Sequence, residues 1–366
     1  MKPIEKLHGL GQSIWYDNIE RRLLNNGELA AMIGRGEIRG VTSNPSIFHN
    51  AIAKSGDYDD ALLPLAKTGA SKEEIYETLA VEDIRAACDL FCPLYDQTDG
   101  GDGYVSLEVS PYLAKDTSGT AADAARLWAW VNRPNLMIKI PATREGLPAI
   151  TQSIAAGINV NVTLIFSIRR YEEVMAAYLA GLEQRLAAGQ SINQVASVAS
   201  FFISRIDSNI DNRLDAIGSQ KALALKGQIA VSNAKLAYAA YKKAFSGQRW
   251  EKLQAAGGRA QRPLWASTST KNPAYPDTKY IDELIGPNTV NTVPPATLIA
   301  FADHGTAALT LEADLAAAQT AMDELAALGI SMTEVTQELE DQGVKAFADA
   351  FTALLDSVEK RRRAAV

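Results

Sequence analysis

Short apolar runs alternate with longer stretches of helical periodicity along almost the whole chain. Many of the apolar runs are rich in Val, Ile, Phe and Trp and are followed by polar residues, which is typical of buried strands. With the turns that close them, these runs occupy residues 13–19, 40–48, 104–110, 136–143, 158–166, 195–203, 263–272 and 289–293. The pattern therefore predicts eight strands.

Helical periodicity separates most of these runs. It predicts helices over residues 20–33, 57–96, 119–132, 145–156, 168–188 and 207–245, and over 313–363 with a break near Gly329. The polar, glycine-rich residues 246–262 are expected to form a loop or an insertion. Strands that alternate with helices indicate a parallel sheet, and eight such units indicate a (β/α)₈ TIM barrel.

An open, doubly wound sheet is the main alternative fold. It would be expected to carry a glycine fingerprint for phosphate, and the one candidate, Gly9-Leu10-Gly11, has the wrong spacing and no clear strand before it. No linker divides the chain, so we expect one barrel domain over 1–366, with 330–366 as a C-terminal helical extension. Phe347, Phe351 and Leu355 would share one face of that extension.

Composition narrows the class of function. A net charge of −7, from 43 acidic and 36 basic residues, disfavours a nucleic-acid binder.

No apolar window approaches the ~18 residues of a membrane span, and no apolar run follows the first residues as in a signal peptide. We therefore expect a cytoplasmic protein with no nucleic-acid or membrane partner. Cys88 and Cys92 fit small apolar roles, and the three histidines lack metal-ligand spacing, so neither a metal ion nor a cofactor is expected.

One predicted strand carries a lysine in its middle. Lys139 lies among the apolar residues of 136–143, where an unpaired ammonium is costly and usually loses its proton or finds a partner. A neutral lysine can attack a carbonyl and form a Schiff base. The alternative reading is a lysine on a solvent-facing side of the strand or in a structural ion pair.

Polar residues also occupy the other predicted strand ends. In a (β/α)₈ barrel these ends meet at the face that carries the chemistry. Each residue has a structural alternative: Asn44 as a helix cap, Thr163 bonded to a carbonyl, Arg205 in a salt bridge. The set comprises Asp17, Thr42, Asn44, Glu108, Lys139, Asn161, Thr163, Ser200, Arg205, Ser269 and Lys271. Packing alone does not explain so many polar groups, because barrel interiors are filled mainly by branched apolar side chains.

These residue types suit carbon–carbon bond chemistry on a phosphorylated sugar. Glu108 is a candidate acid for expelling water as the Schiff base forms, and Asp17 is a candidate base for the substrate hydroxyl. Asn44 and Asn161 are candidates for holding substrate hydroxyls, while Arg205, Ser269 and Lys271 are candidates for holding phosphate. No metal is required, because the iminium accepts the electrons.

The motifs resemble those of the transaldolase family in their order along the chain. The matching stretches lie at 11–18, 40–48, 105–109, 135–143, 159–167, 200–207 and 267–273. The Thr42-Ser43-Asn44-Pro45 turn together with the Lys139 strand is the most specific part of the resemblance. The resemblance also implies that the long C-terminal helix, residues 334–363, packs across the mouth of the barrel.

The resemblance implies transfer of a dihydroxyacetone unit in the non-oxidative pentose phosphate pathway. Sedoheptulose 7-phosphate would be the donor and glyceraldehyde 3-phosphate the acceptor, with sugar phosphates as the partners of a monomer or a homodimer. By motif position, Lys139 would form the Schiff base, Asp17 would be the base, and Glu108 the acid acting through a water that Thr163 positions. Substrate binding would fall to Thr42, Asn44, Asn161, Ser200 and Phe202, and phosphate binding to Arg205, Ser269 and Lys271.

Lys271 departs from the family pattern, because many transaldolases have arginine there, whose planar fork binds phosphate differently. Two other functions remain open at this stage. A fructose 6-phosphate aldolase-like lyase would share Lys139 and the barrel, but such relatives are usually much shorter and use a tyrosine in the acid role. A non-catalytic sugar-phosphate-binding barrel would be free to lose Asp17, Glu108 or Lys139, and the presence of all three argues against it.

Overall fold

The computed structural model describes residues 2–364, so the outermost positions of the expected domain 1–366 and extension 330–366 lie outside the described residues. Eight parallel strands form a closed barrel in sequence order, with β8 pairing to β1. The strands are β1 (Gln12–Tyr16), β2 (Gly40–Val41), β3 (Tyr104–Glu108), β4 (Leu136–Pro141), β5 (Val160–Ile165), β6 (Ser197–Phe202), β7 (Arg262–Ala266) and β8 (Thr289–Val293). The predicted (β/α)₈ barrel is confirmed, and the open-sheet alternative is wrong.

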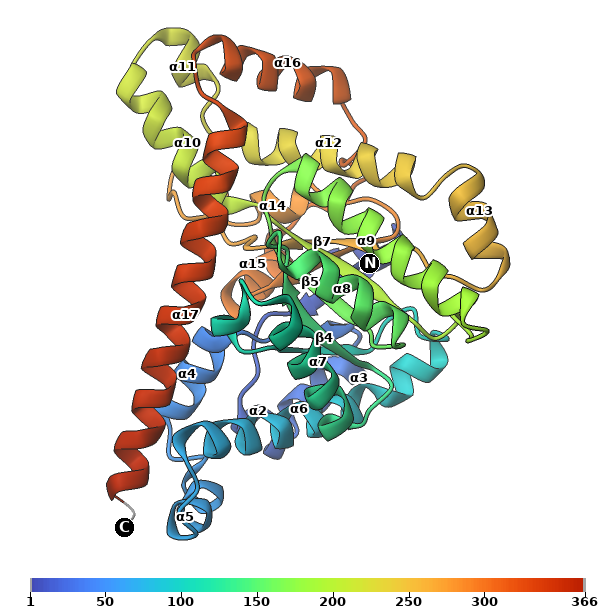
Figure 1. The fold of residues 1–366 in the computed structure, drawn as a ribbon. Helices are drawn as coiled ribbons and strands as arrows, with labels where there is room; N and C mark the ends of the chain where they lie inside the picture. The colour runs from blue at the N-terminus through green and yellow to red at the C-terminus, as the bar shows by residue number, and fades with distance from the viewer. Residues whose placement is uncertain (1, 365–366) are drawn as a thin grey trace.

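Helices surround the barrel (Figure 1). Those of the first half are α1 (Pro3–Gly9), α2 (Arg21–Asn25), α3 (Glu28–Gly34), α4 (Pro45–Lys54), α5 (Asp59–Lys67), α6 (Lys72–Gln97), the 3₁₀ turn η1 (Pro111–Leu113), α7 (Thr117–Val131) and α8 (Gly146–Ala155). Those of the second half are α9 (Ile168–Ala187), α10 (Ser204–Ile217), α11 (Gln220–Ala224), α12 (Ile229–Ala244), α13 (Gln248–Ala255), α14 (Lys279–Asp282), α15 (Pro295–His304), α16 (Leu315–Ala327) and α17 (Met332–Ala364).

The segment 246–262 is not the continuous loop that its polar composition predicts. It contains α13, which buries Trp250 and Leu253, three positions apart on one face. The Trp250 ring meets Phe245 edge to face, with 5.0 Å between the ring centroids. A helix forms here because two apolar anchors outweigh the polar average of the segment.

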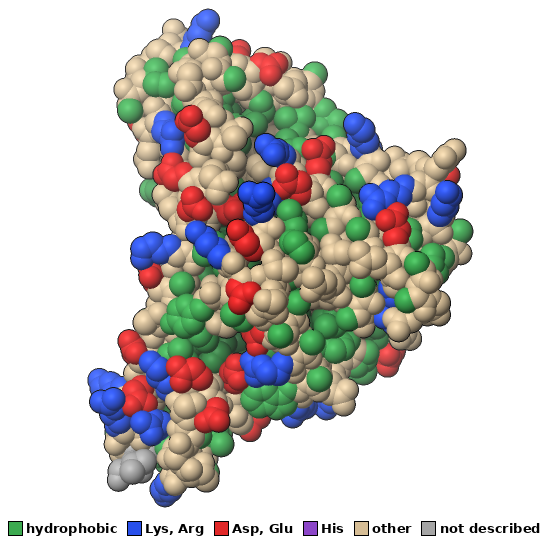
Figure 2. All heavy atoms as spheres, in the orientation of Figure 1, with side chains coloured by type: hydrophobic (Ala, Val, Ile, Leu, Met, Phe, Trp, Pro, Cys, Tyr) green, Lys and Arg blue, Asp and Glu red, His purple; other side chains and the backbone are tan. Residues whose placement is uncertain are grey.

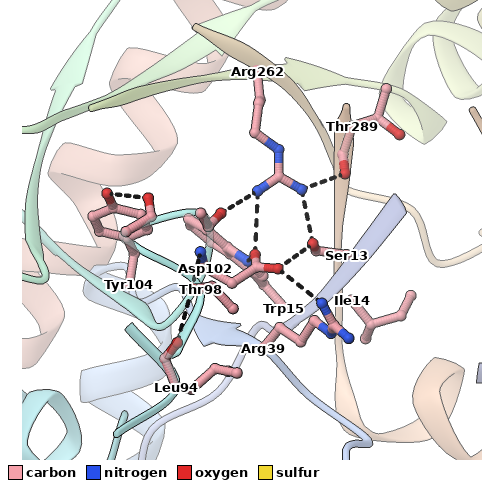
Figure 3. A network of polar contacts seen from close by, with 12 residues as sticks. Ser13, Ile14, Trp15, Arg39, Leu94, Thr98, Asp102, Tyr104, Arg262 and Thr289 are labelled. Carbon is pink, nitrogen blue, oxygen red and sulfur yellow. Dashed lines mark hydrogen bonds and ion pairs between the residues drawn. The ribbon is translucent and has the colours of Figure 1, made fainter. Parts of the chain in front are cut away.

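A polar network ties strands together at the amino-terminal end of the barrel (Figure 3). Asp102, in the turn before β3, accepts hydrogen bonds from Ser13 at 2.7 Å and from the Trp15 indole at 3.2 Å. Arg262 on β7 and Arg39 share the same carboxylate at 3.2 and 3.4 Å. Polar groups at this end of a barrel serve stability, so the acidic, glycine-rich turn 99–103 has a structural role.

The C-terminal helix α17 runs from α10 to α5 and also packs against α4, α6 and β5 (Figure 1). Phe347, Phe351 and Leu355 are all buried, as their spacing predicts. Phe351 meets the rings of Tyr76 and Tyr112 edge to face, with centroids 5.4 and 5.3 Å away. These contacts anchor the helix beside the carboxyl ends of the strands.

Cations gather at the end of α17 (Figure 2). Arg361 donates to the carbonyl of Ile52 at 2.8 Å, and Arg362 and Arg363 pair with Glu359. Positive charge at a helix C-terminus also suits the helix dipole. The basic end of the chain therefore docks the helix onto the barrel.

Candidate active site

A cavity of about 200 Å³ lies at the carboxyl ends of the strands. All the predicted site residues except Glu108 and Asn161 line it. They are Asp17, Thr42, Asn44, Lys139, Thr163, Ser200, Phe202, Arg205, Ser269 and Lys271. Parallel strands end on the same face of the barrel, so residues far apart in sequence converge there.

Lys139 is the buried lysine of the site. Its side chain comes from the middle of β4, and the residue is 4% exposed. The Nζ atom donates to the carbonyl oxygen of Ser43 at 3.0 Å and forms no ion pair within 4.0 Å among residues 2–364. Lys139 is therefore held by a neutral acceptor, which leaves its nitrogen directed into the polar centre of the barrel.

Glu108 sits beside this lysine on the neighbouring strand. The two residues are register partners between β3 and β4. Burial raises the pKa of Glu108 to about 7, with Lys139 opposing the shift and Asp17 adding to it. Its Oε2 atom is buried without a hydrogen-bond partner. A carboxyl group with such a pKa is able both to donate and to accept a proton near neutral pH.

The Glu108 carboxyl does not line the main cavity. It borders a neighbouring cavity of about 20 Å³, the size of one water molecule, whose wall also includes Tyr76 and Phe351. Asn44 lines both cavities. Glu108 therefore lies beside Lys139 but outside the wall of the main cavity.

Asp17 follows the last residue of β1 and is held by two threonines. Thr42 donates to its carboxylate at 2.6 Å, and the hydroxyl of Thr292 lies 2.6 Å from that of Thr42. Burial raises the pKa of Asp17, against the lowering effects of Lys139, the Thr42 hydrogen bond and Lys271. The carboxylate is therefore positioned and made a stronger base than an exposed aspartate.

Asn44 caps a helix, as its structural alternative predicts, and it also lines the main cavity. Its side-chain oxygen accepts from the backbone N–H of Ile47 at 3.0 Å and so caps α4, while Pro45 occupies the first turn. Because the oxygen is engaged, the amide N–H₂ is the part of Asn44 available to a ligand.

Strand β5 is irregular where it meets the site. Its register with β6 shifts between Val162 and Ile165, and Leu164 has a φ of +60°. The Thr163 hydroxyl is buried without a hydrogen-bond partner and belongs to the cavity wall. An unsatisfied buried hydroxyl is costly, and bulges often re-aim side chains beside active sites.

Asn161 is the register partner of Lys139 on β5, but it does not line the cavity. Its amide donates to Ser106 at 3.0 Å, and its oxygen accepts from Ser200 at 2.7 Å. It is fully buried and outside the cavity lining. In this arrangement Asn161 orients Ser200, which does reach the cavity.

Two cations occupy the other end of the cavity. Arg205 forms no ion pair within the described part of the chain, and burial lowers its pKa. The Arg205 guanidinium carbon lies 5.2 Å from the centroid of the Phe202 ring. Lys271 donates to Ser269 at 2.6 Å, and burial together with Arg205 lowers its pKa. Two partly buried cations in one cavity, with Arg205 lowering the pKa of Lys271, suit a doubly charged anion such as a phosphate.

Hydrogen bonds tie the two phosphate-site segments to each other. Asp207 and Asp211 lie on α10, which also carries Arg205. Tyr280 donates to Asp207 at 2.7 Å, and Tyr275 donates to Asp211 at 2.5 Å. Both tyrosines follow Lys271 in the segment that connects β7 to β8. These hydrogen bonds therefore hold the Lys271 segment against α10, which carries Arg205.

Three contributors to the site were missed from the sequence. Thr292 lies near the end of β8, a position where polar residues could have been selected by the same rule as the others. The Ser43 carbonyl gives no sequence signal, because any residue supplies that atom. Phe347 was placed on the buried face of α17, but only the structure shows that its ring lines the cavity.

Among residues 2–364, no group of three or more His, Cys, Asp or Glu side chains is arranged to hold a metal ion. In the same part of the chain, none of the helices has the length and apolar character needed to cross a membrane.

The fold and the cavity together define a (β/α)₈ barrel protein with a buried lysine, two carboxylates and a pair of cations at the carboxyl end of the barrel. The family model described as Transaldolase/Fructose-6-phosphate aldolase matches residues 14–358. The chain belongs to this family of enzymes.

Curated relatives match over nearly the full length. A protein of Thermobifida fusca named Transaldolase is 51% identical over 360 residues, covering 98% of each chain. One of Parafrankia sp. with the same name is 51% identical over 361 residues, again covering 98% of each chain. A Transaldolase of Trichodesmium erythraeum is 49% identical over 366 residues, covering 97% of this chain and 96% of its own.

Proposed function

We propose that this protein is a transaldolase that carries a dihydroxyacetone unit on Lys139 as a Schiff base. It takes the unit from sedoheptulose 7-phosphate and gives it to glyceraldehyde 3-phosphate, forming erythrose 4-phosphate and fructose 6-phosphate. The observation that carries the proposal is Lys139 itself: a buried lysine paired only with a carbonyl, with Glu108 on the next strand and Asp17 in the same cavity.

The first steps join Lys139 to the ketose. The neutral amine adds to the carbonyl carbon at C2 and gives a carbinolamine. Glu108 supplies the proton with which the hydroxyl leaves as water, and an iminium ion remains. A water held between Glu108 and Thr163 would relay this proton, since both side chains have a buried oxygen without a partner. A pKa near 7 lets Glu108 later take the proton back.

The cleavage step belongs to Asp17. Its carboxylate removes the proton of the C4 hydroxyl, the C3–C4 bond breaks, and the electron pair moves to the iminium to form an enamine. The aldose product leaves and glyceraldehyde 3-phosphate takes its place. The enamine then attacks the aldehyde, the new alkoxide recovers the proton from Asp17, and water releases fructose 6-phosphate from Lys139.

The remaining residues place the substrate for these steps. Thr42 holds Asp17, while the Asn44 amide and Ser200, the latter oriented by Asn161, would bind hydroxyls of the three-carbon unit. Phe202 would shape the wall between the reacting centre and the phosphate. A phosphate at Arg205, Ser269 and Lys271 would fix the sugar's far end.

A two-part assay tests the proposal. With sedoheptulose 7-phosphate and glyceraldehyde 3-phosphate, the protein should form fructose 6-phosphate, and the Lys139→Met variant should not. With fructose 6-phosphate alone, little free dihydroxyacetone should appear. Rapid release of dihydroxyacetone without transfer would favour the fructose 6-phosphate aldolase reaction instead. Neither reaction, together with retained sugar-phosphate binding, would favour a non-catalytic barrel.

A further inference from the structure

One aromatic ring in the cavity wall comes from outside the barrel. Phe347 is the residue of α17 that lines the cavity within the described helix, and it is 7% exposed. The centroid of its ring lies 5.8 Å from the Nζ atom of Lys139. The polar centre of the site therefore has an apolar ring whose face lies near the lysine nitrogen.

The position of this ring is fixed on both sides along α17. Gly343 lies one turn earlier, where an added Cβ would come within 2.9 Å of the Leu164 side chain, so a glycine lets the helix approach the bulge of β5 closely. Phe351 lies one turn later and is anchored by Tyr76 and Tyr112. A helix held at both neighbouring turns presents Phe347 as a rigid wall.

We propose that Phe347 determines whether the three-carbon unit on Lys139 is transferred or lost. This inference rests on the proposed function. While the enamine waits for the second aldehyde, a proton from water can add to its carbon and regenerate an iminium. Water then adds to the iminium carbon, the C–N bond breaks, and free dihydroxyacetone leaves with the lysine amine restored. Transfer forms a C–C bond with the aldehyde instead.

The ring favours transfer because it occupies the space from which water would approach the enamine. The polar residues around Lys139 attract water, and Phe347 places a large apolar ring in the same cavity with its face toward the nitrogen. Its face also stabilises a positive charge on the nitrogen, which supports the iminium that precedes cleavage. Phe347 is thus assigned as a specificity-determining residue.

The test compares Phe347→Ala and Phe347→Leu with the unaltered protein. Each protein is given fructose 6-phosphate with and without erythrose 4-phosphate, and the ratio of dihydroxyacetone released to sedoheptulose 7-phosphate formed is measured. We expect the ratio to rise about tenfold in Phe347→Ala and about threefold in Phe347→Leu, which keeps part of the apolar cover. If Phe347→Ala does not fold, the ratio in Phe347→Leu decides.

Leu355→Ala is the matched control. Leu355 is buried on the same helix two turns further on and lies outside the cavity lining, so its loss loosens α17 without opening the site. An unchanged ratio in the Phe347 variants, or an equal rise in Leu355→Ala, would overturn the inference. Failure of the unaltered protein to transfer the unit at all would instead refute the proposed function.

Discussion

Glu108 and Lys139 lie side by side in register on adjacent strands, yet Glu108 lines a small cavity that is distinct from the main one. This arrangement keeps Glu108 close to Lys139 but outside the wall of the main cavity. The carboxyl group can therefore exchange a proton near Lys139 without forming part of the main cavity wall.

Replacing Glu108 by Gln should slow turnover by about 10²–10⁴-fold, the usual contribution of a general acid. Substrate binding should change little, because Glu108 is outside the lining of the main cavity. Steady-state kinetics with sedoheptulose 7-phosphate would measure both quantities. A large rise in KM with unchanged kcat would reassign Glu108 to substrate binding.

The same variant should alter how stability depends on pH. The folded protein raises the pKa of Glu108 from 4.5 to about 7, so the protonated form is favoured by folding. The stabilisation is complete below pH 4.5 and is lost as the pH rises to about 7. Glu108→Gln should match the unaltered protein at pH 4 and melt at a higher temperature at pH 8. A lower melting temperature at pH 8 would show that the ionised carboxylate stabilises the fold.

Replacing Thr42 by Val removes the hydrogen bond to Asp17 and the contact with Thr292. A hydrogen bond to a charged group contributes ~1.5–3 kcal/mol, so kcat should fall about 10–100-fold. Thr42→Ser retains the hydroxyl and should keep most of the activity. Equal losses in both variants would point to packing of the Thr42 methyl group instead.

Replacing Lys271 by Met should weaken the use of phosphorylated acceptors. The kcat/KM for glyceraldehyde 3-phosphate should fall at least tenfold, while the kcat/KM for unphosphorylated glyceraldehyde should stay nearly unchanged, because only the phosphorylated acceptor needs the cation and the donor step does not enter this quantity. Lys271→Arg restores the charge with a planar fork and should recover most of the affinity. A parallel loss with both acceptors would place Lys271 in the chemical step.

Replacing Tyr275 by Phe should also weaken phosphate binding, although Tyr275 does not line the cavity. It breaks the hydrogen bond to Asp211 that links the Lys271 segment to α10. KM for phosphorylated acceptors should rise a few-fold, with kcat for glyceraldehyde unchanged. Tyr238→Phe is the control, because its hydroxyl bonds the Pro287 carbonyl away from the cavity lining. Equal effects in the two variants would indicate general destabilisation.

Much of this site could be predicted because parallel strands converge at one end of a barrel. Knowing the strand order alone brings Asp17, Lys139 and Arg205 to one cavity. The hydrogen-bond partners of individual side chains could not be predicted in the same way. Asn161 was expected to face substrate, but its amide is engaged by Ser106 and Ser200, and that choice depends on side-chain geometry across three strands.

Elements outside the alternation of strands and helices were harder to predict. The helix α13 was expected as part of a loop, because two apolar anchors are a weak signal in a polar segment. The buried face of α17 was predicted, since Phe347, Phe351 and Leu355 repeat at helical spacing. Which of these three side chains comes near Lys139 depends on how α17 docks on the barrel, and no local sequence pattern determines that.

The central claim is that Lys139 carries the three-carbon unit, and borohydride trapping tests it most directly. The protein is incubated with fructose 6-phosphate and sodium borohydride, and the reduced adduct is located by peptide mass spectrometry. The account predicts one dihydroxyacetone-derived adduct, on Lys139, which Lys139→Met lacks and Lys271→Met retains. An adduct on a different lysine, or none in a protein that still transfers the unit, would contradict it.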